Sequence, residues 1–295
     1  MLCSIILNSQ PFPAAQSHEV VPWWSFTKPV LAGAALTLVR DGLIQLDETI
    51  PDTQFSLRQL LKHQAGLADY SELTAYHAAV ADSQLPWSAD EMMRRLDGSR
   101  LRYTPGAGWR YSNVGYMFVA QLIERVTGLC IDDALTQRVF TPLGVSHVRL
   151  AKKQADLAGV YPPTLASYDP GWVYHGLLVG PLSQATLLLD GLLTKDLLPD
   201  SLVQEMQDSI VLGGPLSGRP WAIPGYGLGL MIGKTHSGHR LVGHTGVGPE
   251  GVIAVYHCSN GSNQATCSVF AKGGDEGRGE TQVLDQLIAA VGPCA

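Results

Sequence analysis

A serine and a lysine stand three positions apart in the stretch WWSFTKPVLAGAALTLVRDG, which covers residues 23–42. On a helix, residues three apart share a face with their Cβ atoms about 5–6 Å apart, so the hydroxyl of Ser25 and the amine of Lys28 can meet. The amine accepts the serine proton only when it is neutral, and burial in apolar surroundings favours that form because desolvation penalises the charge. The apolar run after Lys28 predicts such burial. We therefore predict a nucleophile and its base, with Ser25 at a helix amino terminus whose free N–H groups can stabilise an oxyanion.

Two specified positions are a weak signal alone, because a serine N-cap followed by an exposed lysine is the usual arrangement. A second motif, RYSNVGY, places Tyr111 and Asn113 in a loop just before a helix. A phenol beside a lysine can relay protons, and an amide can bind both the lysine and a substrate carbonyl. The alternative is a loop tyrosine, with Asn113 as the cap of the following helix.

A third motif, GHTGVGPEG, carries His244, Thr245 and Gly246 at the end of a predicted strand. A glycine in a strand leaves room for a substrate to pair along the edge and for a backbone N–H to face an oxyanion. The alternative is an ordinary turn at a strand end.

The elements that must position these motifs change in character along the chain. CSIILN predicts one short strand, and PFPAA after it predicts a break. Residues 25–40 predict a helix buried all round, which stops at Asp41–Gly42. Residues 55–202 predict short helices joined by glycine and proline loops, with N-caps at Ser56 and Ser88. From Tyr226 onward the hydrophobic residues recur with a period of two, which predicts two β-hairpins. Residues 280–292 predict a helix at the end of the chain.

Helices in the middle of the chain and strands near its end predict an α/β fold. In this fold an antiparallel sheet is flanked by helices and carries an inserted all-helical lobe. We assign residues 1–54 and 222–295 to the α/β lobe and residues 55–221 to the helical lobe, with the active site between them.

Composition narrows the classes of function. The net charge is −6 and there is no basic block, so we expect no nucleic-acid partner. No apolar stretch is long enough to predict a membrane span. No basic segment precedes MLCSIIL, as a secretory signal requires, so we expect a cytoplasmic protein, or a periplasmic one if a longer precursor exists.

The five cysteines are odd in number and form no C-x-x-C, which favours reduced thiols. A hairpin centred on Gly261-Ser262-Asn263 would place Cys258 opposite Cys267. A cross-strand disulfide is one interpretation of that placement, and two free core thiols are the preferred one.

Three histidines in HSGHRLVGH, namely His236, His239 and His244, raise the question of a metal. The first two fall in a predicted turn and only Glu250 offers a carboxylate nearby, so we predict no metal site. We predict no cofactor either, and the sequence leaves the oligomeric state open.

The three motifs together resemble a known family. Ser25-x-x-Lys28, Tyr111-x-Asn113 and the strand motif at His244 follow the motif order of serine β-lactamases and penicillin-binding proteins. The tyrosine and histidine variants resemble the class C branch, with its esterases, D-amino-acid peptidases and LACTB-like hydrolases. The segments YTPGAGWRYSNVGYMFVAQLIERVTG, FTPLGV and GYGLGL are similar to that family as well. The resemblance covers most of the chain, from about residue 23 to the carboxyl terminus.

The resemblance implies a β-lactamase/transpeptidase-like fold and a role for each motif residue. Ser25 would be acylated, Lys28 would take its proton, and Tyr111 would serve as base or proton relay. The N–H groups of Ser25 and Val247 would form the oxyanion hole. Substrate binding would fall to Asn113, His244, Thr245, Gly246 and Val247. Family members usually carry two strands ahead of the serine helix, and only 24 residues precede Ser25, so we expect a smaller sheet or a strand supplied differently.

The histidine variant bears on the substrate. His244 stands where penicillin-recognising members usually carry a lysine, so a permanent cation for a substrate carboxylate is missing. We therefore expect a serine hydrolase that acts through an acyl-enzyme on small uncharged esters. The alternatives are a β-lactamase or a D-amino-acid peptidase or amidase of the same fold, and a catalytically idle homologue that binds a ligand or partner. The expected partner is a small-molecule ester or amide.

Overall fold

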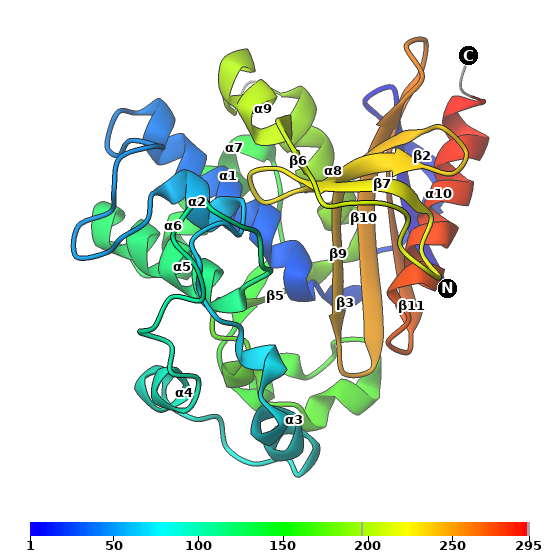
Figure 1. The fold of residues 1–295 in the computed structure, drawn as a ribbon. Coiled ribbons are helices and arrows are strands. Elements are labelled where there is room, and N and C mark those ends of the chain that lie inside the picture. Colours follow the sequence, from blue (N-terminus) through cyan, green and yellow to red (C-terminus); the bar gives the residue numbers. More distant parts are fainter. Residues whose placement is uncertain (196, 294–295) are drawn as a thin grey trace.

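The computed structural model describes residues 1–195 and 197–293, and its centre is an eight-stranded antiparallel sheet (Figure 1). The strands lie in the order β2-β1-β11-β10-β9-β8-β7-β6, so both ends of the chain contribute to one sheet. Their bounds are β1 Leu2–Leu7, β2 Gln10–Gln16, β6 Ile210–Val211, β7 Trp221–Tyr226, β8 Met231–Thr235, β9 Arg240–Gly248, β10 Gly251–Ser259 and β11 Gln264–Lys272.

Helices cover the sheet, and a second, three-stranded sheet lies beside it in the order β3-β5-β4. The strands of this second sheet are β3 Val20–Pro22, β4 Arg149–Ala151 and β5 Leu177–Pro181. The α-helices of the described residues are α1 Thr27–Arg40, α2 Leu57–Leu61, α3 Thr74–Ala81, α4 Ala89–Arg95, α5 Asn113–Thr127, α6 Ile131–Leu135, α7 Thr141–Leu143, α8 Leu182–Thr194, α9 Asp200–Gln207 and α10 Glu276–Val291.

Successive residues of the central strands pack alternately into two hydrophobic cores, one on each face of the sheet. In β10, Ala254 and Tyr256 belong to the core under α10, whereas Ile253 and Val255 belong to the larger core that includes α1 and α8. Because both faces of the sheet are covered, the strand is apolar at successive positions. This architecture confirms the predicted β-lactamase/transpeptidase-like α/β fold.

Helix α1 is buried on every side, as predicted. Each residue from Thr27 to Leu38 is buried, and the helix packs against α5, α6 and α8. The α-helix begins at Thr27, so Ser25 lies in the short 3-10 turn η1, Trp24–Phe26, that leads into it. The nucleophile candidate is therefore presented by a turn at the end of a rigid core helix.

Serine residues cap three of the helices. Ser56 and Ser88 each accept a hydrogen bond from the backbone N–H three residues on, which confirms both predicted caps. Ser112 caps α5 by accepting from the N–H of Gly115 at 3.1 Å. The alternative that Asn113 is the cap is therefore wrong, and its side chain remains available to the site.

The amino terminus corrects one prediction. PFPAA forms most of strand β2, where we predicted a break. Pro11 and Pro13 are tolerated because β2 is the edge of the sheet, where one side of the strand needs no partner. The expectation of a smaller sheet or a strand supplied differently is also wrong, since β1 and β2 both precede Ser25.

The late hairpins are confirmed with two changes. Strand β7 precedes the first hairpin and β8 begins at Met231, five residues after the predicted start. In the second hairpin Cys258 pairs with Ala265 and Tyr256 with Cys267, so the cysteines are not opposite each other. The turn is centred one residue earlier than we predicted, and this shift moves every cross-strand partner by two. The sulfur of Cys267 instead lies 3.9 Å from that of Cys3 on β1.

The two-lobe division remains a prediction. Helix α8 lies inside the range 55–221 assigned to the helical lobe, yet it packs on β1 and β11 of the sheet. Within residues 1–195 and 197–293, no single helix is long and apolar enough to cross a membrane. Helix α5 and the segment Ile131–Leu143 reach that length only as a pair, bent by 81°.

Candidate active site

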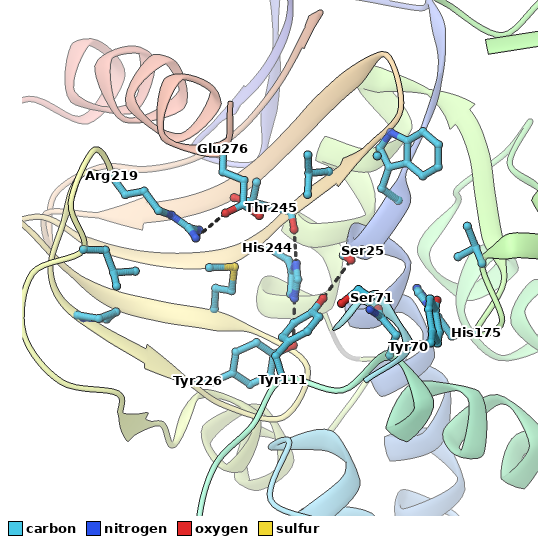
Figure 2. Close-up of a pocket in the computed structure, with 18 of the residues that line it drawn as sticks. Ser25, Tyr70, Ser71, Tyr111, His175, Arg219, Tyr226, His244, Thr245 and Glu276 are labelled. Atoms are coloured by element: carbon cyan, nitrogen blue, oxygen red, sulfur yellow. Dashed lines mark hydrogen bonds and ion pairs between the residues drawn. The ribbon is translucent and has the colours of Figure 1, made fainter. Parts of the chain in front are cut away.

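Ser25 lines a cavity of about 730 Å³ that is bordered by β9, the loop before α5 and the start of α10 (Figure 2). Figure 2 shows Ser25 between two differently built parts of this cavity: Arg219 and Glu276 lie on one side, and His175 on the other. Except for Lys28, every residue that we predicted from the three motifs either lines the cavity or, in the case of Gly246, lies in the strand along it.

Strand β9 can approach Ser25 because residue 246 is glycine. A Cβ atom at Gly246 would lie 2.6 Å from the carbonyl oxygen of Trp23 and 2.8 Å from the backbone nitrogen of Ser25. The pairing of β9 with β8 ends at Gly243, so the strand has no strand partner on that side from residue 244 onward. The backbone of β9 thus runs against the turn that holds Ser25, which is where an oxyanion hole from Ser25 and Val247 would form.

We expect Gly246→Ala to lower kcat/KM by about 10²–10³, because the added methyl group pushes β9 away from Ser25 and removes one oxyanion donor. Steady-state kinetics with a chromogenic ester measures this loss. Gly214→Ala is the matched control, since a Cβ there meets no atom within 4 Å. An active Gly246→Ala protein would contradict the role that we give to β9.

Lys28 is fully buried one turn beyond Ser25. Its Nζ lies 3.0 Å from Ser25 Oγ and 2.7 Å from Asn113 Oδ1. Burial lowers the pKa of Lys28 from 10.5 to about 7, against the opposing charge of Asp69. A large fraction of the amine is therefore neutral near pH 7, as a general base must be.

Asn113 is held in one orientation by an acid that the sequence did not single out. Its backbone N–H and its Nδ2 donate to Asp69 Oδ1 at 3.0 and 3.1 Å. The amide oxygen is therefore the atom that faces Lys28. Asp69 lies in a loop, LADYSE, whose composition is ordinary for a turn, so no pattern in the sequence points to it.

Tyr111 contacts Ser25 as well, and Lys28 Nζ lies over its ring, 4.9 Å from the centroid. Its hydroxyl donates to Ser25 Oγ at 3.0 Å, and its ring lies on His63 with the centroids 4.3 Å apart. Burial raises the pKa of Tyr111 well above its usual value. The phenol is thus protonated at rest, which fits a proton donor and relay better than a phenolate base.

His244 is buried and neutral. Its Nδ1 lies 2.7 Å from the carbonyl oxygen of Thr245 and so donates to it, and its Nε2 accepts from the hydroxyl of Tyr226 at 3.0 Å. Burial, reinforced by Lys28, lowers the pKa of His244 to about 3. The ring therefore offers a substrate no positive charge.

With this geometry in place, comparison with known proteins identifies the family. The Beta-lactamase family model matches residues 8–274. The chain belongs to the β-lactamase family.

Its relatives include a D-aminopeptidase and a penicillin-binding protein. A D-aminopeptidase of Brucella anthropi is 26% identical over 227 residues, which cover 76% of this chain and 43% of that protein. Penicillin-binding protein 4* of Bacillus subtilis is 27% identical over 159 residues, which cover 51% of this chain and 34% of that protein. The chain thus spans less than half the length of these curated relatives.

Solved structures share the fold. The D-amino acid amidase of Ochrobactrum anthropi SV3 superposes with a TM-score of 0.78 at 21% identity, over 98% of this chain and 94% of that one. The octameric penicillin-binding protein homologue of Pyrococcus abyssi gives a TM-score of 0.76 at 18% identity, over 97% of this chain and 73% of that one. At these identities the likeness shows the fold alone.

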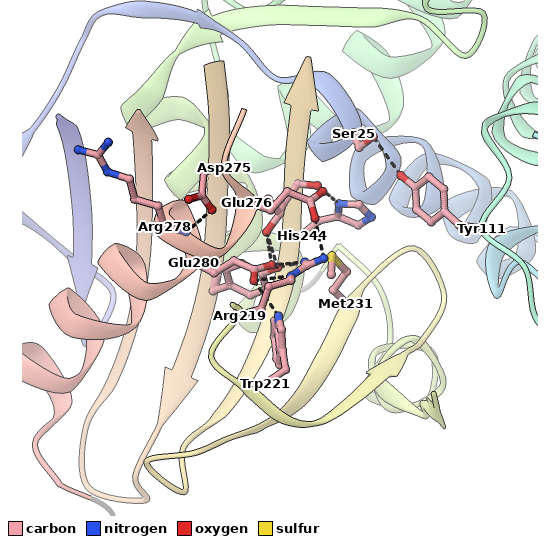
Figure 3. Close-up of polar contacts among 12 residues, drawn as sticks. Ser25, Tyr111, Arg219, Trp221, Met231, His244, Asp275, Glu276, Arg278 and Glu280 are labelled. Carbon is pink, nitrogen blue, oxygen red and sulfur yellow. Dashed lines mark hydrogen bonds and ion pairs between the residues drawn. The ribbon is translucent and has the colours of Figure 1, made fainter. Parts of the chain in front are cut away.

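Two further features of this β-lactamase family member were not predicted from its sequence. His175 is buried, and its Nε2 lies 3.3 Å from Lys28 Nζ. It sits in VYHGLLVG, just before β5, where nothing distinguishes it from a core histidine. Arg219, Glu276 and Glu280 form the second feature, an ion-pair cluster at the other end of the cavity (Figure 3).

The cluster pairs one guanidinium with two carboxyl groups, and burial raises the pKa of Glu276. Arg219 donates to Glu276 at 2.6 Å through Nη1 and to Glu280 through both Nε and Nη2, so each of its three nitrogens is engaged. Glu280 has no exposed surface and also accepts from Thr245 Oγ1 at 2.7 Å. The Thr245 hydroxyl therefore points into the protein. Glu276 lines the cavity, so one arginine balances two carboxylates beside the substrate space.

The histidine stretch gives no metal site. His239 is buried against the carboxyl-terminal segment, with Nε2 3.1 Å from the carbonyl oxygen of Gly292. Within the described ranges no group of three or more His, Cys, Asp or Glu side chains is placed to hold a metal ion.

Proposed function

We propose that the chain is a serine hydrolase that cleaves small amides through an acyl-enzyme on Ser25, with amides of D-amino acids as the preferred class. The observation that carries the proposal is the contact of Ser25 Oγ with two groups in complementary states. A lysine amine with a pKa of about 7 lies 3.0 Å away, and a protonated phenol donates from 3.0 Å. A base and an acid that both contact one hydroxyl activate it as a nucleophile for acyl transfer.

The proposed acylation moves one proton, in net, from Ser25 to the leaving nitrogen through three transfers. As Ser25 Oγ bonds to the substrate carbonyl carbon, its proton passes to Lys28. When the carbon–nitrogen bond breaks, the leaving nitrogen takes the Tyr111 hydroxyl proton. The phenolate then recovers a proton from Lys28, whose Nζ lies 4.9 Å from the Tyr111 ring centroid. Water attacks the ester in the second half-reaction, the same groups take up and return its proton, and the carboxylic acid leaves.

The relatives favour amides over the esters that we predicted first. Two of the relatives are named for action on D-amino acids, a D-aminopeptidase and a D-amino acid amidase. A serine nucleophile that is acylated by an amide can also be acylated by an ester. Esters therefore remain expected secondary substrates. The idle homologue is disfavoured because the serine, lysine and tyrosine are all within hydrogen-bond distance.

Charge in the cavity supports a neutral or cationic substrate. His244 is neutral, and the guanidinium of Arg219 is paired with Glu276 and Glu280. A carboxylate such as that of a penicillin meets no unpaired cation at this end of the described cavity. An amino-acid amide, whose ammonium group is positive, is a better match for a cavity end where two carboxyl groups pair with one guanidinium.

A substrate panel tests the proposal. We expect kcat/KM for D-alanine p-nitroanilide to exceed that for nitrocefin by at least about 100-fold, and the L-isomer to be slower than the D-isomer. The Ser25→Ala variant, measured with the same substrates, gives the turnover rate that does not depend on Ser25. Dominant nitrocefin turnover would overturn the substrate charge preference. Turnover of p-nitrophenyl butyrate without any amide turnover would return the function to an esterase.

A further inference from the structure

We infer that His175 is a positioning residue for acylation: its neutral ring accepts a hydrogen bond from Lys28 and, with Asn113, directs the lysine lone pair at Ser25. This inference rests on the proposed role of Lys28 as the base. His175 belongs to none of the three sequence motifs and comes from a different part of the chain, the turn before β5.

A neutral lysine amine has two N–H bonds and one lone pair. Three polar atoms surround Lys28 Nζ: Asn113 Oδ1 at 2.7 Å, Ser25 Oγ at 3.0 Å and His175 Nε2 at 3.3 Å. The amide oxygen of Asn113 can only accept. For the lone pair to receive the serine proton, the second N–H must go to His175. Nε2 of His175 is then an acceptor.

The ring is in a suitable state for this role. His175 is only 4% exposed, and burial, followed by the charges of Lys28, His244 and His63, lowers its pKa well below the usual value. Its Nδ1 has no hydrogen-bond partner among the described residues. With the ring proton on Nδ1, Nε2 faces Lys28 as a lone pair. The opposite tautomer would donate into the lysine lone pair and compete with Ser25.

The same contact acts after the proton has moved. The ammonium form of Lys28 has three N–H bonds, and Asn113 and His175 accept two of them while the third faces the serine oxygen. His175 therefore stabilises the charge that acylation creates. Its removal should lower the basicity of Lys28 as well as loosen its orientation.

The other titratable groups around this pair are Asp69, Tyr111, Tyr116, His63 and His244. Each of them is retained in a variant of His175. A displaced pH profile in such a variant therefore reports the loss of the His175 acceptor, whereas a purely structural role would lower the amount of folded protein without moving the profile.

The test is the rate constant for phosphonylation of Ser25 by a fluorophosphonate probe, in which Ser25 Oγ bonds to phosphorus and fluoride leaves, measured from pH 5 to 10. For His175→Phe we expect a high-pH plateau about tenfold or more lower, and an acid limb displaced to lower pH by about one unit. His175→Gln, which restores an acceptor oxygen, should recover much of both. The control His257→Phe removes a partly buried histidine on β10 and should leave the profile unchanged.

Two outcomes overturn the inference: an unchanged rate and profile in His175→Phe, or an acid limb displaced to higher pH, which would mean that His175 donates to the lysine. If His175→Phe does not fold, ¹⁵N NMR of histidine-labelled parent protein decides, with His175→Gln giving the assignment. A protonated Nδ1 supports the inference and a protonated Nε2 contradicts it. Lys28→Ala separates the proposals: if that variant acylates at the parent rate, the proposed function itself fails.

Discussion

Replacing Ser25 with alanine is expected to lower kcat/KM for amides and esters by about 10⁴-fold or more, since removal of a nucleophile abolishes the covalent route and leaves only binding and the oxyanion site. The fold should not change. Ser25 lies in a turn, its hydroxyl meets only Lys28 and Tyr111 among the described residues, and alanine fits the same backbone. Initial rates with enzyme freed of contaminating esterase measure the effect.

Ser71→Ala is the matched control for this variant. Ser71 lines the same cavity, but its hydroxyl donates to Asp69 at 2.5 Å and has no contact with Lys28. We expect it to lose no more than about tenfold. A Ser25→Ala protein that retains a tenth of the parent activity would show that the reaction runs elsewhere.

Lys28→Met is expected to lower the acylation rate by about 10²–10⁴, the usual contribution of a general base. In the parent protein the rate should fall about tenfold per pH unit below pH 7, because protonation of Lys28, with its pKa of about 7, removes the base. The variant should lack this acid limb. Stopped-flow measurement of the first turnover over pH 5 to 10 tests both statements, and a variant with the parent profile would contradict them.

The same variant should be more stable than the parent at neutral pH. Burial holds the pKa of Lys28 at about 7 in the folded chain, against 10.5 when exposed. Each tenfold change in the acid dissociation constant corresponds to about 1.4 kcal/mol, so keeping Lys28 charged in the folded chain costs on the order of 5 kcal/mol below pH 7. The loss of contacts to Asn113 and Ser25 offsets part of the gain, so we expect about 1–3 kcal/mol from Lys28→Met.

The pH dependence of this stability difference has a definite sign. Between pH 7 and 10.5 the unfolded chain holds a proton on Lys28 that the folded chain has lost, so the parent gains stability as the pH rises through that window. The advantage of Lys28→Met should shrink accordingly. Urea unfolding at pH 7 and pH 10 measures it. A Lys28→Met protein that is more stable than the parent is folded, so its slower acylation reports the loss of the base and not the loss of the fold.

The features that could be predicted from the sequence are those that depend on residues close together in the chain. The buried helix at residues 27–40, the serine caps and the late hairpins follow from hydrophobic period and hydrogen bonding within a few residues. Ser25 and Lys28 belong to this class, because one helical turn joins them. Residue chemistry made Tyr111 and the strand motif around His244 candidates, and their order in a family resemblance decided between the functional and the structural interpretation.

The missed features depend on distant partners. Asp69, His175 and Glu280 each act through a residue at least 35 positions away, and their own surroundings in the sequence are ordinary. Strand β2 was missed because its prolines suit an edge position, and only the completed sheet defines that edge. The displaced partner of Cys267 has a similar cause, since one residue of turn placement changes the whole register.

The central claim is that Ser25 is the nucleophile that becomes acylated. A fluorophosphonate probe phosphonylates such a serine with loss of fluoride, so intact-protein mass spectrometry after brief treatment with the probe tests the claim most directly. We predict a single adduct whose formation slows as the pH falls below 7, which peptide mapping places on Ser25 and which Ser25→Ala does not form. No adduct at pH 8, or an adduct of equal yield on Ser25→Ala, would contradict the account.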